Sequence, residues 1–554
     1  MSHAEGENAG ALIVEPDGVK DSRALFWLES SLKRVYPQSP VGEKRALEII
    51  TARNRNISLQ ACVRNERIYP LNVECSVSGT DDLKIRVRRV GYVPMHHLTT
   101  DTDLSELEGA PYTPGLVPDP LFPENKTSIG PYENQSFWIT ITIPRDAKPG
   151  TKNLTIKYSF HDNTQSVELK AKIDVRSLVI EPRKNFPVIH WWRPEDIYDY
   201  HNLEPWSDEW YKLAKPYLEN LLSHGSDVIF VPAIYPRREY IRRPAQMLKV
   251  TESAPNKFEF DFTEVRKFIR FAKECGFEYF EWPHLWIYWG VKSPMRVYKW
   301  VDGKPVEFWP PDEDGFGERY MSFLRQFLPE LHKFLMEEKI EDKSYFHISD
   351  EPGGDEAFER YTKARQILRD LAPWMKIMDA LSEVRYGKTG IVDFPIPIVS
   401  TAQEYVDAKL PHWVYYCCGP RGPWLNRFFD TPLTKIRMSG WLFYKLKADG
   451  FLHWGYNYWR KMEQDELVNP FADSTSACWP GIPYGDPFVV YPGADGPIDS
   501  IRWEVFSESL EDFAMLQTMK LKRENPLLSD IKTYADFPKN EEWINQALAT
   551  LLEK

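Results

Sequence analysis

Two adjacent carboxylates, Asp350 and Glu351, are the strongest candidates for chemistry in this sequence. They lie within the segment Tyr345-Phe-His-Ile-Ser-Asp-Glu-Pro-Gly-Gly354. Its first residues are mostly apolar, which predicts a buried strand that ends at the pair. A carboxylic acid beside a carboxylate is the pairing that glycosidic bond cleavage uses. The structural alternative is a helix cap, because Asp is favoured at the N-cap and proline in the first turn, here near Pro352.

The adjacency of this pair restricts the mechanism. In retaining glycosidases the two carboxyl groups face each other about 5–5.5 Å apart, whereas neighbours on a strand point to opposite faces. A second, facing carboxylate would have to come from another strand. The strand predicted at His412–Cys418 and the loop after it offer none, because they contain no Asp or Glu before Asp430. In a substrate-assisted route the sugar's own 2-acetamido oxygen is the nucleophile. Glu351 would then be the acid and base. Asp350 would orient the acetamido group, and repulsion within the pair would keep one of the two protonated.

Aromatic and polar residues at other predicted strand ends form a second set of candidates. A pyranose ring packs its apolar face on Trp or Tyr, while its hydroxyls need polar partners. We expect Trp454 and Trp286 to be platforms and Tyr416 or Tyr456 to donate a hydroxyl to the acetamido oxygen. The predicted substrate contacts are Trp192, Trp286, Asp379, Tyr416, Trp454, Tyr456 and Asn457. The alternatives are core packing for each aromatic residue and helix capping for Asp379.

No metal or cofactor is expected. The 12 histidines are scattered, and no HExxH, Walker A or GxGxxG motif occurs. His347 and His453 lie on predicted strands, where a hydrogen-bonded or substrate-contacting role is more common than metal ligation.

The candidate residues must be positioned by the fold. The pattern of apolar and polar residues that predicts this fold changes near residue 180. Before that point apolar and polar residues alternate with period two, as in Val167–Val175, which predicts an antiparallel β-sandwich over residues 1–180. After it, short apolar strands alternate with helix-length segments such as Phe262–Cys275. This order predicts a (β/α)8 barrel in residues 181–554, with active-site residues at the carboxyl ends of its strands. A C-terminal extension with a helix at Ile501–Lys520 completes the predicted second domain.

Composition excludes several classes of partner. The net charge is 69 − 81 = −12 and there is no basic run, so we expect no nucleic acid partner. No apolar run reaches about 18 residues, so we expect no membrane insertion. Residues 1–20 lack the pattern of a secretory signal, and six cysteines without a disulfide spacing fit a reducing cytoplasm. The alternative of a secretory signal that has been trimmed away stays open. The oligomeric state is not predicted.

The strand end His347-Ile-Ser-Asp-Glu-Pro352 resembles that of glycoside hydrolase family 123, the β-N-acetylgalactosaminidases. The strand Gly450–Trp459, the Asp486-Pro-Phe488 turn and Ser500-Ile-Arg-Trp-Glu504, followed by Glu511-Asp-Phe513, resemble the C-terminal part of that family. The resemblance covers residues from about 180 to 520. It implies retaining, substrate-assisted hydrolysis of β-linked N-acetylgalactosamine (GalNAc), as on glycosphingolipid glycans, with the roles of Asp350 and Glu351 given above.

Two other functions stay open at this point. One is a conventional two-carboxylate retaining glycosidase that uses Glu351 with Glu404 or Asp379. The other is a non-catalytic, glycan-binding barrel protein. The residues alone do not separate GalNAc from N-acetylglucosamine, or exo from endo action.

Overall fold

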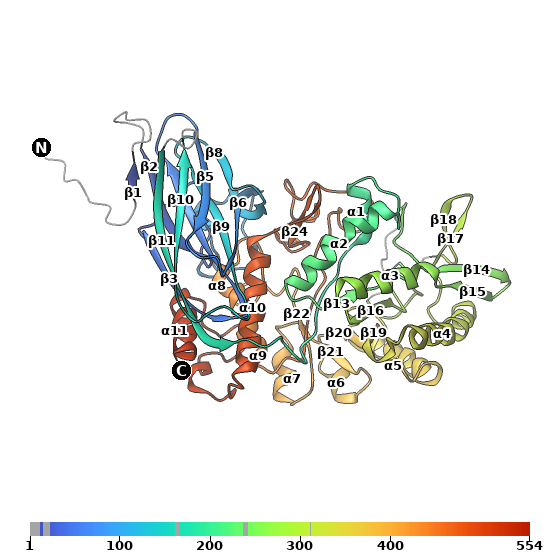
Figure 1. The fold of residues 1–554 in the computed structure, drawn as a ribbon. Coiled ribbons are helices and arrows are strands. Elements are labelled where there is room, and N and C mark those ends of the chain that lie inside the picture. The colour runs from blue at the N-terminus through green and yellow to red at the C-terminus, as the bar shows by residue number, and fades with distance from the viewer. Residues whose placement is uncertain are drawn as a thin grey trace, which may run out of the picture.

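The computed structural model describes residues 12–14, 23–160, 165–235, 242–287, 289–310 and 312–553. The Met1–Lys20 stretch, expected to lack a secretory signal, lies outside the described residues except for 12–14. The described residues form a β-rich region followed by an α/β region (Figure 1). The chain thus has a mixed β and α/β fold, as its two periodicities predict.

Two sheets make up the β-rich region. In order across the first sheet the strands are β1 (Leu12–Val14), β2 (Ala24–Ser30), β4 (Arg55–Asn65), β9 (Asn134–Ile143), β6 (Lys84–Met95) and β7 (Gly115–Phe122). Across the second they are β3 (Ala46–Arg53), β11 (Gln165–Val179), β10 (Gly150–Phe160), β5 (Leu71–Ser78) and β8 (Lys126–Ile129). The pairings are antiparallel except β3 with β11. One apolar cluster, with members such as Phe137, Ile156 and Ile173, draws on both sheets.

Alternation along β11 places Val167, Leu169 and Ile173 in this cluster, with polar residues between them. An antiparallel sheet commonly leaves one face to solvent, but β9 does not. Trp138 is fully buried on its other face, in the same core as the α/β region. The second region covers this face of the sheet, and the local pattern of alternation contains no information about that covering layer.

Eight short parallel strands run through the α/β region. They are β12 (Val188–His190), β13 (Val228–Phe230), β16 (Tyr279–His284), β19 (Ser344–His347), β20 (Met378–Ala380), β21 (Phe394–Ile396), β22 (Val414–Tyr415) and β23 (Phe451–His453). Six of them form one sheet, in the order β19-β16-β13-β12-β23-β22, and β20 pairs with β21 separately. Single bridges, Phe346 with Ile377 and Ile398 with Tyr415, link the two sheets. The described strands are therefore a six-stranded and a two-stranded sheet, and the closed (β/α)8 barrel stays a prediction.

Most of the helices connect these strands, and the last two follow the final strand. They are α1 (Pro194–Tyr200), α2 (Asp208–Ser223), α3 (Thr263–Cys275), α4 (Glu318–Glu338), α5 (Gly354–Leu371), α6 (Arg385–Thr389), α7 (Ala402–Asp407), α8 (Leu433–Arg437), α9 (Ser439–Lys445), α10 (Ile501–Thr518) and α11 (Glu541–Leu552). Three hairpins, β14 (Lys249–Ala254) with β15 (Lys257–Asp261), β17 (Tyr298–Val301) with β18 (Lys304–Glu307) and β24 (Val490–Gly493) with β25 (Gly496–Asp499), extend the loops. In the described part of the chain, none of the helices has the length and apolar character needed to cross a bilayer.

Helix α10 joins the two regions. It lies between them in Figure 1 and contacts β4 and β7 on one side and α8 and α9 on the other. Its N-cap Ser500 accepts a hydrogen bond from Trp503 N–H. Nearly all of its side chains are buried, including the charged Arg502 and Asp512. We call the buried contact of α10 with the β-rich region the seam.

Candidate active site

Asp350 and Glu351 follow β19 at its carboxyl end. The Glu351 backbone has a φ of +43°, which is uncommon for a residue other than glycine and marks a constrained turn. Two hydrogen bonds fix this turn, from Glu351 N–H to Ala380 O (3.2 Å) and from Trp289 N–H to Asp350 O (2.8 Å). Helix α5 begins only at Gly354, and its N-cap is Gly353, without a side-chain cap. Asp350 therefore does not cap this helix.

A cavity of about 210 Å³ lies beside the two carboxylates. Its lining combines Asp350 and Glu351 with an aromatic set, Trp191, Trp289, Tyr415, Trp454 and Tyr458, and with Arg193, Cys417, Cys418 and Glu463. Aromatic faces with a few polar groups are the lining that a sugar ring needs. We call this space the cavity.

The two carboxylates differ in their surroundings. Asp350 is half-buried and Glu351 is exposed. Burial and the neighbouring Glu351 carboxylate raise the pKa of Asp350 well above its ordinary value, against the lowering effect of the His347 and Arg193 charges. The Tyr415 hydroxyl donates a hydrogen bond to Glu351 Oε1 at 2.5 Å. Asp350 therefore keeps its proton over a range where an isolated Asp would have lost it.

Arg193 supplies positive charge to the cavity wall. Its residue is 7% exposed, and its Nε has no hydrogen-bond partner among the described residues. The Asn457 side chain holds the Arg193 backbone from both sides, accepting from its N–H (2.7 Å) and donating to its carbonyl oxygen (3.0 Å). The guanidinium lies 5.7 Å from the Trp191 ring. The Arg193 backbone is thus fixed in place, while its Nε is left for another partner.

A buried hydrogen-bonded network lies beneath Trp191. His347 contacts Asp379 through Nδ1 (3.0 Å) and Glu281 through Nε2 (2.7 Å). Glu281 also accepts from Trp191 Nε1 (2.7 Å), and Asp379 accepts from the Tyr361 hydroxyl (2.6 Å). Burial opposes the charged form of His347, but the hydrogen bonds with Asp379 and Glu281 outweigh it and raise its pKa to about 10. The network holds the wall residue Trp191 and places a positive charge near Asp350.

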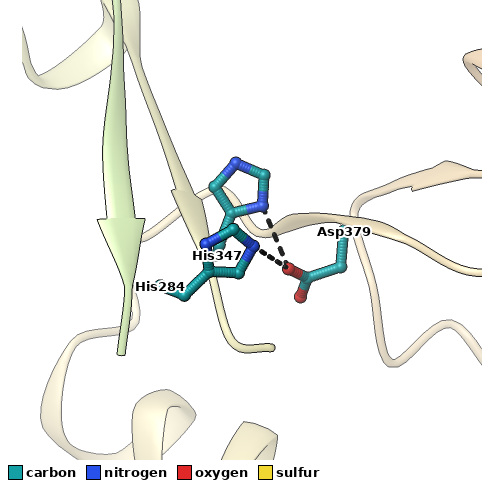
Figure 2. Close-up of side chains that lie close together, drawn as sticks. All are labelled: His284, His347 and Asp379. Carbon is teal, nitrogen blue, oxygen red and sulfur yellow. Dashed lines mark hydrogen bonds and ion pairs between the residues drawn. The ribbon is translucent and has the colours of Figure 1, made fainter. Parts of the chain in front are cut away.

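His284, His347 and Asp379 also form a cluster whose ligand atoms lie within 4.8 Å of one another (Figure 2). Figure 2 shows both imidazoles directed at the same Asp379 carboxylate. Both nitrogens of His347 already contact carboxylates, and its raised pKa favours imidazolium, which has no lone pair for a metal. A second such cluster, His224, Asp499 and Glu504, lies at the seam, where Arg88 pairs with both acids.

Trp454 reaches the cavity from the end of β23. Its Nε1 donates to Asp486 Oδ2 at 2.9 Å, and its ring lies 5.2 Å from that of Tyr458. Burial raises the pKa of Asp486 to about 7. Of the predicted site residues, Asp350, Glu351 and Trp454 line the cavity together.

The other predicted contacts are placed elsewhere. Trp192 is fully buried and donates to Phe230 O (3.0 Å), and Trp286 is fully buried and donates to Gly315 O (2.7 Å). Tyr416 packs on Phe451 in the core, with ring centroids 5.0 Å apart.

Tyr456 donates its hydroxyl to Asn220 Oδ1 (2.9 Å), away from the cavity. Asp379 and Asn457 are buried beneath the lining, where they hold His347 and Arg193. The structure therefore places six predicted residues outside the cavity lining, and their roles as direct sugar contacts stay predictions: Trp192, Trp286, Tyr416, Tyr456, Asp379 and Asn457.

Two of these differences between prediction and structure have a common cause. Trp191 and Tyr415 line the cavity next to the predicted Trp192 and Tyr416. Both pairs lie at or just beyond the end of a strand, β12 or β22. Where the chain stays extended, successive side chains point to opposite sides, so a shift of one residue exchanges the core for the cavity. The Trp191-Trp192 and Tyr415-Tyr416 pairs are aromatic at both positions, so residue type does not distinguish the inward member of either pair.

Three further lining residues were not predicted from the sequence. Arg193, Trp289 and Glu463 lie on loops after strands, where no period identifies the inward side. A weak signal existed for Arg193, because it directly follows two tryptophans at a predicted strand end.

Comparison with known proteins supplies the final observation. Residues 191–519, more than half of the chain, match the family described as "Glycoside hydrolase 123, catalytic domain". A family 123 glycoside hydrolase from Clostridium perfringens, whose structure was solved to explain glycolipid glycan hydrolysis, is 16% identical. The two structures align over 96% of this chain and 97% of that one, with a TM-score of 0.73.

Other solved structures are less similar. A β-glucuronidase from Parabacteroides merdae is 10% identical over 90% of this chain and 52% of that one, with a TM-score of 0.32. An endo-β-1,4-mannanase from Thermotoga petrophila is 12% identical over 61% and 77%, with a TM-score of 0.34. Neither of these two likenesses is close enough to bear on function. No curated protein sequence matches the chain.

Proposed function

The chain belongs to glycoside hydrolase family 123, and on that premise we propose that this glycosidase releases β-linked GalNAc from glycans by a retaining, substrate-assisted mechanism. One observation carries the proposal: Asp350 and Glu351 are adjacent at a strand end and line one cavity with aromatic residues. The (β/α)8 barrel, with its boundary near residue 180, is the scaffold that we propose for it. We expect the substrate to be a glycan of the glycosphingolipid type, by analogy with the Clostridium perfringens relative.

In the proposed first step, the acetamido oxygen of the substrate attacks the anomeric carbon. Glu351 gives its proton to the leaving oxygen, and Asp350 accepts a hydrogen bond from the acetamido N–H. An oxazolinium ion forms, and its positive charge is stabilised by the Asp350 carboxylate. Glu351, now ionised, then removes a proton from the attacking water, and the β-configuration is retained.

The electrostatics of the pair suit these two roles. In the free protein, burial and repulsion favour a proton on Asp350. A bound acetamido N–H needs an acceptor, so substrate binding favours the ionised form of Asp350 and leaves the shared proton to Glu351. The proton then lies on the exposed residue, next to the leaving group.

The two carboxylates first considered as partners of Glu351 in a two-carboxylate mechanism do not line the cavity. Asp379 is buried and bonded to His347 and Tyr361, and Glu404 is an exposed residue of α7 outside the cavity lining. Glu463, however, lines the cavity and is the carboxylate that could face Glu351 in such a mechanism. Glu463→Gln therefore belongs in the test.

Substrate selectivity provides that test. We expect hydrolysis of 4-nitrophenyl β-GalNAc, inhibition by the thiazoline analogue of GalNAc, and no turnover of 4-nitrophenyl β-galactoside or β-glucoside, which lack the acetamido group. Efficient hydrolysis of the plain galactoside, abolished in Glu463→Gln, would instead establish the two-carboxylate mechanism. A non-catalytic glycan-binding protein would bind GalNAc glycans in calorimetry without releasing 4-nitrophenol.

A further inference from the structure

Two neighbouring cysteines, Cys417 and Cys418, lie on the wall of the cavity. Both are half-buried, and both line the cavity together with Glu351 and Trp454. Their sulfur atoms are 3.8 Å apart, far beyond the roughly 2.05 Å of a disulfide, so both are free thiols. None of the catalytic steps proposed above uses them.

The backbone around the two thiols is firmly held. Cys417 N–H donates to Gly419 O (2.8 Å), and Asn426 donates to Cys417 O (3.0 Å). Arg421 donates from Nε to Cys418 O (3.1 Å) and from Nη2 to Pro480 O (2.9 Å). Only the side-chain torsions of the two cysteines are left to adjust. A ligand that binds both sulfurs therefore pays little conformational entropy to order the site.

We propose that Cys417 and Cys418 form a vicinal dithiol site for trivalent arsenicals, and that occupation of this site closes the cavity to the sugar. The reaction is a condensation without electron transfer. Phenylarsine oxide forms two As–S bonds, both S–H bonds break, and their protons leave with the arsenic-bound oxygen as one water molecule. Soft sulfur ligands select a thiophilic centre of this kind over the hard oxygens of Asp350 and Glu351.

The position of the site explains why its occupation would block activity. Tyr415, which donates to Glu351, lies two residues before Cys417 on the same strand end. An arsenic atom bridging the two sulfurs would hold its phenyl ring in the cavity, where a ring of six atoms occupies the space of one pyranose. This blocking effect, unlike the binding itself, rests on the proposed function.

The remaining cysteines provide controls. Cys62 and Cys75 are buried in the β-rich region, and Cys275 ends α3. Cys478 is also half-buried and lies on another loop, where burial and then the nearby Cys418 raise the pKa of the Cys478 thiol. Cys478→Ser is therefore the matched control for Cys417→Ser and Cys418→Ser.

Intact-mass measurement tests the binding without reference to any substrate. With phenylarsine oxide we expect one phenylarsenic group per chain, removed by 2,3-dimercaptopropanol and not by an equal concentration of 2-mercaptoethanol. The adduct should form in Cys478→Ser and be lost in Cys417→Ser and Cys418→Ser, with Cys417→Ala and Cys418→Ala as second variants if a serine variant misfolds. An adduct that is absent from the unmodified chain, that persists in the single Cys417 and Cys418 variants, or that needs Cys478 overturns the proposed site.

Hydrolysis of 4-nitrophenyl β-GalNAc, normalised to each untreated variant, tests the blocking. The activity that remains should equal the fraction of protein without the adduct. Full activity in the fully modified protein overturns the blocking effect and leaves the mass result to decide the site. A protein without activity before treatment contradicts the proposed function, and the mass result still decides the site.

Discussion

Two buried arginines, Arg502 at the seam and Arg193 at the cavity, have opposite surroundings. Arg502 is fully buried and uses all five of its N–H donors, on Asp119 and on the carbonyl oxygens of Arg427, Gly485 and Phe488. Arg193 is nearly as buried, yet its Nε has no partner among the described residues. All the donors of Arg502 are thus used within the fold, whereas the Nε of Arg193 is available to a ligand.

One carboxylate of the seam, Asp512, differs from Asp350 at the cavity in the same way. Asp512 at the seam accepts from Arg55 (2.9 Å), from Arg437 (2.7 Å) and from Trp441 (3.0 Å). Burial opposes its charged form, but Arg437 and Arg55 hold the pKa of Asp512 below its ordinary value. At the cavity, burial and the adjacent Glu351 instead raise the pKa of Asp350. Asp512 therefore stays ionised in the native state, whereas Asp350 keeps a proton that can move.

The largest expected effect is on the cavity side. Glu351→Gln removes the proposed acid and base, and we expect kcat to fall by about 10²–10⁴. The free energy of unfolding should change little, because Glu351 is exposed. Steady-state kinetics and urea unfolding measure the two effects. A variant with wild-type kcat would remove Glu351 from the mechanism.

At the seam, Asp119→Ala should have the converse effect. It leaves Arg502 buried without its carboxylate, which costs about 3–5 kcal/mol of unfolding free energy. We expect a lower thermal midpoint with kcat/KM preserved at temperatures where the variant is folded. Because α10 contacts both regions, both should unfold in one transition, and two separated transitions in calorimetry would contradict that expectation.

Arg193→Met is the cavity counterpart of that substitution. A hydrogen bond from a charged group contributes about 1.5–3 kcal/mol, so we expect kcat/KM to fall by roughly 10–150-fold. Unlike at the seam, the free energy of unfolding should change little, since Arg193 forms no ion pair within the described residues and loses its contact with the Trp191 ring. A strong loss of stability with normal kinetics would show that Arg193 is structural and would break the comparison.

A smaller effect is expected from Tyr415→Phe. This change removes the 2.5 Å hydrogen bond to Glu351, and water can take its place at the exposed carboxylate. We expect a loss in kcat of about tenfold, at the low end for a bond to a charged group. The pH–rate profile should shift, because the bond favours ionised Glu351. An unchanged profile would argue that the contact is only structural.

The smallest effect concerns stability as a function of pH. Because the pKa of Asp350 is raised, the native state keeps its proton above the unfolded value of about 3.9, and wild-type stability falls as pH rises through that window. Asp350→Asn cannot lose a proton there. Urea unfolding at pH 4 and pH 8 should show the variant gaining stability relative to wild type at the higher pH. A gain at the lower pH would reverse the sign of the inferred shift.

Some motifs behind the family resemblance are structural. Arg502 and Glu504 of the Ser500–Glu504 segment and Asp512 of the later one form the ion pairs of the seam. Asp486 holds Trp454. These residues identified the family correctly, although they support the fold and the cavity wall without lining the cavity.

The sequence by itself determined the change from period-two strands to alternating strands and helices, the family, and the Asp350-Glu351 pair at a strand end. These features are local: they depend on residue order and on short periodicities. The tertiary structure alone decided that Trp191 and Tyr415 face the cavity instead of Trp192 and Tyr416, and that Trp138 is buried in the core of the α/β region. Which side of a strand is inside, and which charges find partners, depends on elements hundreds of residues apart, such as Asp119 and Arg502. Packing sets those choices, and no local pattern records them.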